Sequence, residues 1–219
     1  MITKNIKKRL FTGLILLGIL FFMFKYNFFS LYILVILSVI SLIEFNNLIT
    51  RIILKNFSKI ILNLLFFIYI FSFSFLFFYF SNFLKLKIIL YSLIIGCISS
   101  DIGGFIFGKI LKGPKLTKIS PNKTISGVFG SIIFTIIFFN LFLLILTNQI
   151  NLYLIIVAIL ISIGCQFGDL FFSFLKRKAK IKDTGKILPG HGGLLDRVDG
   201  IIFTVPFVYL ILKFDSFVF

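Results

Sequence analysis

The chain has 219 residues, of which 59% are hydrophobic and 14% are charged, against roughly 45–50% and about 25% in soluble globular domains. A soluble domain of this size could not bury so much apolar surface, so a soluble enzyme, a disordered chain and a disulfide scaffold are excluded. The 23 basic residues outnumber the 7 acidic ones, for a formal net charge of +16. In a polytopic membrane protein, basic cytoplasmic loops explain such an excess.

Seven apolar segments approach the length of about 20 residues that a membrane-spanning helix requires. They are 10–24, 28–46, 60–80, 88–108, 126–147, 152–173 and 200–214. The first and the last are short, and no small-residue cleavage site of a signal peptide follows the first. The sequence therefore predicts an all-α helical bundle in the membrane, with about seven transmembrane helices.

The basic residues predict the orientation of these helices. If the N-terminus is cytoplasmic and the seven segments alternate, 19 of the 23 basic residues lie on the cytoplasmic side. Because cytoplasmic loops carry an excess of Lys and Arg, this distribution favours an N-in, C-out arrangement. Two large loops, 109–125 and 174–199, would then face the cytoplasm, and a bacterial inner membrane is the expected location.

Five of the seven acidic residues lie on or beside these two loops. They are Asp101, Asp169, Asp183, Asp196 and Asp199. A carboxylate within a membrane span costs about 2.5–3.5 kcal/mol on insertion scales, so Asp101 and Asp169 are functional candidates. Glu44 lies at an inner helix end and is expected to be solvated or interfacial. Cys97 and Cys165 lie in apolar runs and are expected to be small core residues.

The first loop and its flanks carry groups that can hold a phosphate chain. Asp101 is followed by Gly103 and Gly104, which allow close approach of a helix or a ligand. Further on, 119–127 offers hydroxyls, Lys123 and the start of a new helix, and helix N-termini bind anions. An ordinary basic loop with a helix cap remains an alternative interpretation of this segment.

The second loop is dense in residue types that act on phosphates. Asp196 and Asp199 would share a face of a helix that begins there, and their hard oxygens suit Mg²⁺. The basic run 176–186 suits phosphate charge, but it could also bind anionic lipid. His191 could be a turn residue, and Asp183 could form a surface ion pair.

The stretch from Ser173 to Asp199 reads S-x-x-K-R-x-x-x-x-K-D-x-G-x-x-L-P-G-H-G-G-L-L-D-R-V-D. It resembles the signature of the CDP-diacylglycerol synthase (phosphatidate cytidylyltransferase) family. The segments around Asp101-Ile-Gly-Gly, Ser120-Pro-x-Lys-Thr and Gly168-Asp-Leu are similar to the family's and follow in the same order. The chain is shorter than the family norm, which predicts that an N-terminal helix or two is missing. Asn122 and Ser126 also depart from the family pattern.

The resemblance implies transfer of CMP from CTP to phosphatidic acid, giving CDP-diacylglycerol and pyrophosphate. It implies that Asp169 and Asp196 are Mg²⁺ ligands. The site would hold one or two divalent ions, and it could also hold a monovalent cation. The resemblance also places N-terminal transmembrane helices in 1–85 and a catalytic transmembrane region in 86–219. The further catalytic candidates are Lys176, Arg177, Lys182, Asp183, His191, Arg197 and Asp199. The candidates for the CTP side are Asp101, Ser120, Lys123 and Thr124.

The expected partners are CTP, phosphatidic acid and the lipid bilayer, with a homodimer possible and nucleic acid excluded. Two other functions stay open. A CTP-dependent polyprenol or phytol kinase would attack the γ-phosphorus and release CDP instead of pyrophosphate. A non-enzymatic transporter would place its polar residues near the middle of the membrane, whereas here the carboxylates gather toward one side.

Overall fold

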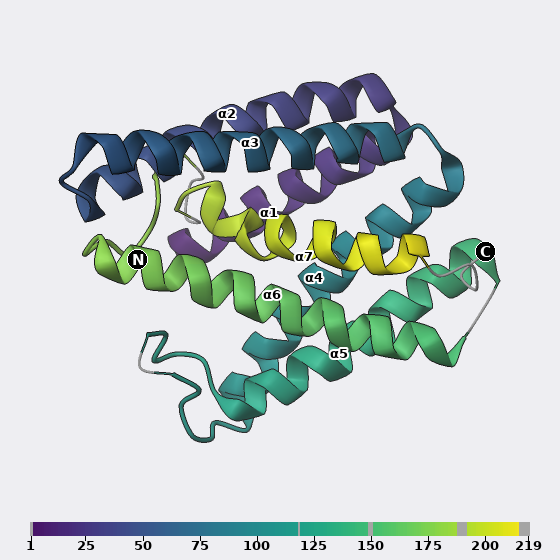
Figure 1. Cartoon of the computed structure of the whole chain (residues 1–219). Helices are drawn as coiled ribbons and strands as arrows, with labels where there is room; N and C mark the ends of the chain where they lie inside the picture. Colours follow the sequence, from purple (N-terminus) through teal and green to yellow (C-terminus); the bar gives the residue numbers. More distant parts are fainter. Residues whose placement is uncertain (1, 118, 149–150, 188–191, 215–219) are drawn as a thin grey trace. The chain divides into compact units, whose positions relative to one another are not determined.

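The computed structural model describes residues 2–117, 119–148, 151–187 and 192–214, and these ranges form seven helices (Figure 1). They are α1 (Ile2–Lys25), α2 (Asn27–Ile52), α3 (Asn56–Ser81), α4 (Leu84–Ile110), α5 (Ile125–Thr147), α6 (Leu152–Lys178) and α7 (Leu195–Phe214). Each predicted apolar segment lies within one of them, and the described ranges contain no strand, only an isolated β-bridge between Lys115 and Thr124. The all-α prediction is confirmed.

Five of the described helices, α2 to α6, are long and apolar enough to cross a membrane. The apolar part of α1, Phe11–Lys25, is shorter, in line with its short predicted segment. Large apolar side chains remain exposed along α2 and α3, which a soluble protein would have to cover. The chain is therefore a polytopic integral membrane protein whose exposed apolar surface faces lipid.

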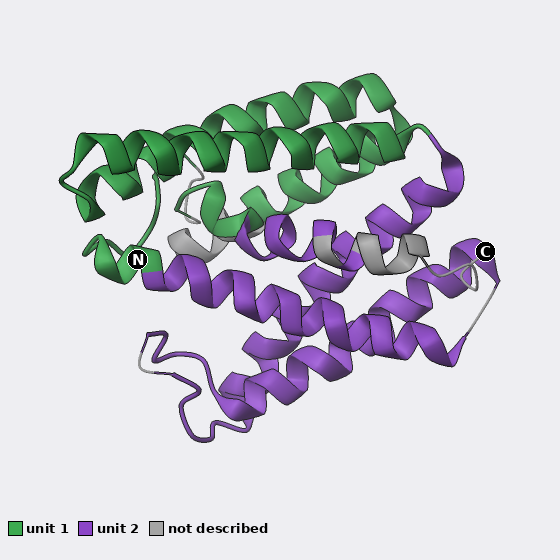
Figure 2. Cartoon of the chain, in the orientation of Figure 1, with its two compact units in different colours: residues 1–82, 175–198 green, residues 83–174, 199–219 purple. Residues whose placement is uncertain are grey.

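The chain divides into two compact units (Figure 2). Unit 1 comprises residues 1–82 and 175–198, and unit 2 comprises residues 83–174 and 199–219. In unit 1, α2 and α3 lie side by side, joined by a short connection (Figure 1). Phe45 stacks on Phe66 with ring centroids 3.9 Å apart, and the hydroxyls of Ser38 and Ser74 are 2.8 Å apart. Apolar packing and a polar contact therefore both join α2 to α3.

In unit 2, glycines bring α4 and α5 into close contact. A Cβ atom at Gly127 would lie 2.9 Å from the backbone oxygen of Gly104, and one at Gly130 would collide with Phe107. Helices in membranes associate through small residues that let the backbones approach closely. This packing fixes the two ends of the loop that joins the helices, and it explains the glycines that follow Asp101 in the sequence.

Candidate active site

In unit 2, Asp169 on α6 forms an ion pair with Lys123. Lys123 Nζ lies 2.8 Å from Asp169 Oδ2, and both side chains are about one-quarter exposed, at 28% and 25%. The backbone of the loop holds Lys123 in place, since Leu116 N donates to Lys123 O (2.8 Å) and Lys123 N donates to Ser120 O (3.0 Å). Two of the predicted site residues, 46 positions apart in sequence, are thus brought together.

The helix expected after this loop begins at Ile125. Thr124 is its N-cap, because its side chain accepts a hydrogen bond from Gly127 N at 3.1 Å. Ser126 Oγ lies 3.0 Å from Thr124 Oγ1 and donates to Lys112 O at 2.9 Å. The two hydroxyls therefore order the helix start that directly follows Lys123.

The other carboxylate oxygen of Asp169, Oδ1, lies near the first turns of α7, which pack closely on α6. A Cβ atom at Gly168 would lie 2.9 Å from Asp199 O, and one at Gly200 would lie 3.4 Å from Asp169 Oδ1. Asp199 is buried, and its Oδ1 accepts a hydrogen bond from Gly200 N at 2.9 Å. Glycine at both positions lets the backbone of α7 approach the Asp169 carboxylate.

In unit 1, Asp196 in the first turn of α7 is paired with Lys176. Lys176 Nζ lies 2.6 Å from Asp196 Oδ1, and the two side chains are 14% and 5% exposed. The other oxygen, Oδ2, accepts hydrogen bonds from Thr184 N (2.8 Å) and Gly193 N (3.2 Å). As predicted, a helix begins here, and both Asp196 and Asp199, three positions apart, belong to α7.

The prediction that Glu44 is solvated or interfacial is wrong. Glu44 is 2% exposed and accepts hydrogen bonds from Thr184 Oγ1 and from the backbone of Leu194 and Leu195. A buried carboxylate is tolerated where several donors satisfy it. The sequence signal was present, because Glu44 is a lone charge among apolar helical residues, like Asp101 and Asp169.

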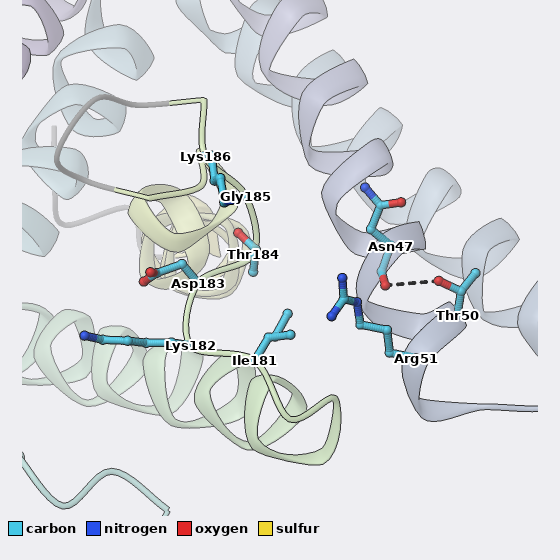
Figure 3. A pocket seen from close by; sticks show the side chains of 9 residues that line it. All are labelled: Asn47, Thr50, Arg51, Ile181, Lys182, Asp183, Thr184, Gly185 and Lys186. Carbon is cyan, nitrogen blue, oxygen red and sulfur yellow. Dashed lines mark hydrogen bonds between the residues drawn. The ribbon is translucent and has the colours of Figure 1, made fainter.

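Unit 1 also contains a cavity of about 680 Å³ between the end of α2 and the segment 181–186 (Figure 3). Arg51 extends from α2 toward this segment, and Lys182, Asp183 and Lys186 are also among the lining residues, although the Lys182 and Asp183 side chains point away from Arg51. The residues around the cavity include three cationic side chains and one anionic side chain, so the local charge is net positive. Arg51 lies outside the signature and was not predicted as a site residue.

The remaining predicted residues are less enclosed. Asp101 is exposed in the interior of α4, and Arg177 and Arg197 are exposed on α6 and α7. Asp183 lies beside Gly192, whose φ of +86° favours glycine. Within the described ranges Asp183 forms no ion pair with a neighbouring lysine. His191 lies outside the described residues.

The side chains available as metal ligands determine whether Mg²⁺ fits this site. The described residues contain no group of three His, Cys, Asp or Glu side chains that could hold a metal ion. Asp169 suits Mg²⁺, because Lys123 uses only Oδ2 and a bound Mg²⁺ commonly takes one or two carboxylates plus substrate phosphates. Asp196 has both oxygens engaged, so metal binding there requires a free lone pair on Oδ1 or release of Lys176.

Comparisons with known proteins agree with the signature. Residues 3–215 match the model of the cytidylyltransferase family. The chain is 42% identical over 120 residues to a phosphatidate cytidylyltransferase of Bacillus subtilis, 37% over 122 residues to one of Helicobacter pylori and 42% over 132 residues to one of Rickettsia bellii. These alignments cover 54–57% of this chain but only 45–56% of the relatives, so the chain matches about half of their length.

Proposed function

The chain belongs to the cytidylyltransferase family, and we propose that it is a phosphatidate cytidylyltransferase, as the relatives described above are named. In the proposed reaction, a phosphate oxygen of phosphatidic acid attacks the α-phosphorus of CTP. A new P–O bond forms, the bond between the α-phosphorus and the bridging oxygen breaks, and pyrophosphate leaves. Because the nucleophile is already an anion, positioning and charge neutralisation would supply most of the catalysis.

The observation that carries this proposal is a lysine paired with an aspartate in each of the two polar regions, Lys123 with Asp169 and Lys176 with Asp196. A lysine can exchange its carboxylate partner for a phosphate oxygen, because both are charged acceptors. Two polyanionic substrates can be brought together only if their negative charge is neutralised. Each of the two regions contains a lysine, paired with an aspartate, that could do this.

Mg²⁺ is the proposed cofactor, with Asp169 and Asp196 as its proposed ligands. When bound, it would neutralise charge on the substrate phosphates and the leaving pyrophosphate. Lys123 and Lys176, once released from their carboxylates, would donate hydrogen bonds to phosphate oxygens. Asp101, Ser120 and Thr124 stay candidates for the CTP side.

The remaining roles also stay predictions. We propose that the exposed basic residues of the second loop contribute phosphate-binding charge, and that Asp183 and Asp199 either act as further ligands or organise the Lys and Arg residues. His191 stays a candidate for orienting a phosphate. Several other expectations likewise stay predictions: the location in a bacterial inner membrane, the cytoplasmic side of the site, the catalytic region from residue 86 onward, a bound monovalent cation and the homodimer.

The experiment supplies detergent-purified protein with phosphatidic acid, Mg²⁺ and CTP labelled separately at its α- and γ-phosphates. The proposal predicts α-label in the lipid and γ-label in pyrophosphate. γ-Label in the lipid would instead identify a CTP-dependent lipid kinase. No transfer by folded protein would contradict both enzymatic functions.

A further inference from the structure

Glu44 lies on α2, outside the signature, and its carboxylate binds both ends of segment 184–195, the signature loop, in unit 1. Oε2 accepts hydrogen bonds from Thr184 Oγ1 (2.7 Å) and Leu195 N (2.9 Å), and Oε1 accepts one from Leu194 N (3.0 Å). The side chain is only 2% exposed. All three bonds are within the distance range of good hydrogen bonds, so both oxygens have partners inside the protein.

Two of the three donors lie at the N-terminus of α7. The first N–H groups of a helix lack partners within the helix, and they lie at the positive end of its dipole. Glu44 therefore caps α7 from another helix, with a full negative charge. The third donor, Thr184, ties the beginning of the loop to the same carboxylate.

At two glycine positions, the signature loop lies too close to Glu44 to accommodate any larger residue. A Cβ atom at Gly185 would collide with the Glu44 carboxylate, and one at Gly193 would collide with Thr184 Oγ1 and approach Glu44 Oε2. Glu44 therefore requires glycine at position 185, and Thr184 together with Glu44 requires glycine at position 193.

Glu44 and Asp196 hold the same two stretches of backbone. Glu44 binds the side chain of Thr184 and the amides after Gly193, while Asp196 binds the amides of Thr184 and Gly193 themselves. We propose that Glu44 is a positioning residue that fixes these two stretches of backbone and, through them, the orientation of Asp196. This role in catalysis rests on the proposed function, whereas the contact itself does not.

The test uses Glu44→Gln in the full-length protein. Glutamine keeps the volume of the side chain, but its NH₂ group faces a donor, so at least one hydrogen bond is lost. We expect the amides of Leu194 and Leu195 to exchange hydrogen at least tenfold faster and kcat to fall about 100-fold, the scale of loss caused by a small displacement of catalytic groups. KM for CTP should change much less than kcat.

Ser41→Ala is the matched control. Ser41 is buried on α2, one turn before Glu44, and its hydroxyl has no hydrogen-bond partner among the described residues. Its replacement should leave both amide exchange and kcat unchanged. All assays are run well below the unfolding temperature, so that kcat refers to folded protein.

Unchanged exchange in Glu44→Gln would overturn the proposed contact, and faster exchange with full activity would overturn the positioning role. Equal effects in Ser41→Ala would also contradict it, since they would indicate a general effect of substitution in α2. If the unsubstituted protein is inactive with CTP and phosphatidic acid but the exchange difference is present, the proposed function fails and the loop contact stands.

Discussion

Asp196 makes one buried ion pair and two hydrogen bonds to backbone amides, so it contributes both to stability and to the proposed chemistry. Removing one partner of a buried ion pair typically costs about 3–5 kcal/mol, because the remaining charge is left uncompensated. Asp196→Asn alone is therefore expected to lower the thermal unfolding midpoint and to abolish CMP transfer. Activity and unfolding are measured on the same detergent-solubilised samples.

A double variant separates these two contributions. Combining Asp196→Asn with Lys176→Gln removes the uncompensated lysine charge, so part of the lost stability should return, while activity should stay absent. A double variant that regains activity would contradict any direct role of Asp196 in catalysis. Equal destabilisation in the single and double variants would contradict the importance of the ion pair.

Lys123 provides a second prediction at the scale of single residues. Lys123→Gln removes the cation beside Asp169, and loss of one charge-stabilising group at a reacting centre typically costs about 100-fold or more in kcat. Lys115→Gln is the control, because Lys115 is an exposed lysine of the same loop and is not part of the ion pair. Initial rates with labelled CTP measure both variants, and equal losses would indicate a nonspecific effect of loop charge.

The sequence predicts which residues belong to the candidate site better than it predicts which residues they contact. The family resemblance predicted that Asp169, Lys176 and Asp196 belong to a site, with Lys176 and Asp196 inside the signature and Asp169 in the segment just before it. The partner of each carboxylate depends on contacts between distant segments, which no local pattern contains. The donors to Glu44 likewise lie 140 to 151 positions away, so the sequence marked Glu44 as an unusual charge but did not identify its partners.

At the scale of helices, hydropathy predicted seven elements and underestimated their lengths. The segment predicted as 152–173 belongs to a helix that continues to Lys178. Hydropathy detects the apolar part of a span, but backbone hydrogen bonds continue into polar surroundings, where basic side chains favour the C-terminal end. Two residues beyond this end, Lys180 has φ +54°, and Ile181 N donates to Lys176 O in a Schellman pattern.

The contact between α4 and α5 yields a prediction at the same scale. Gly130→Leu places a side chain where Phe107 already lies, so it should separate the helices and lower the unfolding midpoint strongly. Gly13→Ala is the control, because a Cβ atom there meets nothing within 4 Å and alanine favours a helix by about 1 kcal/mol over glycine. Unfolding midpoints in detergent measure both, and a neutral Gly130→Leu would contradict close packing of these helices.

At the scale of the whole molecule, the basic residues predict which loops face the cytoplasm, and cysteine labelling can test this. Both native cysteines, Cys97 and Cys165, are buried as predicted, so their background labelling should be low. Two exposed leucines form a matched pair: Leu54, between α2 and α3, is 92% exposed, and Leu84, at the start of α4, is 72% exposed.

In the N-in arrangement, successive connections alternate between the two sides of the membrane. A membrane-impermeant maleimide should therefore label Leu84→Cys in intact cells, and it should label Leu54→Cys only after the membrane is opened. The reverse pattern would place the signature loop and its lysine–aspartate pair outside the cell, away from CTP. Because the proposed reaction needs CTP from the cytoplasm and phosphatidic acid from the bilayer, such a result would contradict the function as well as the topology.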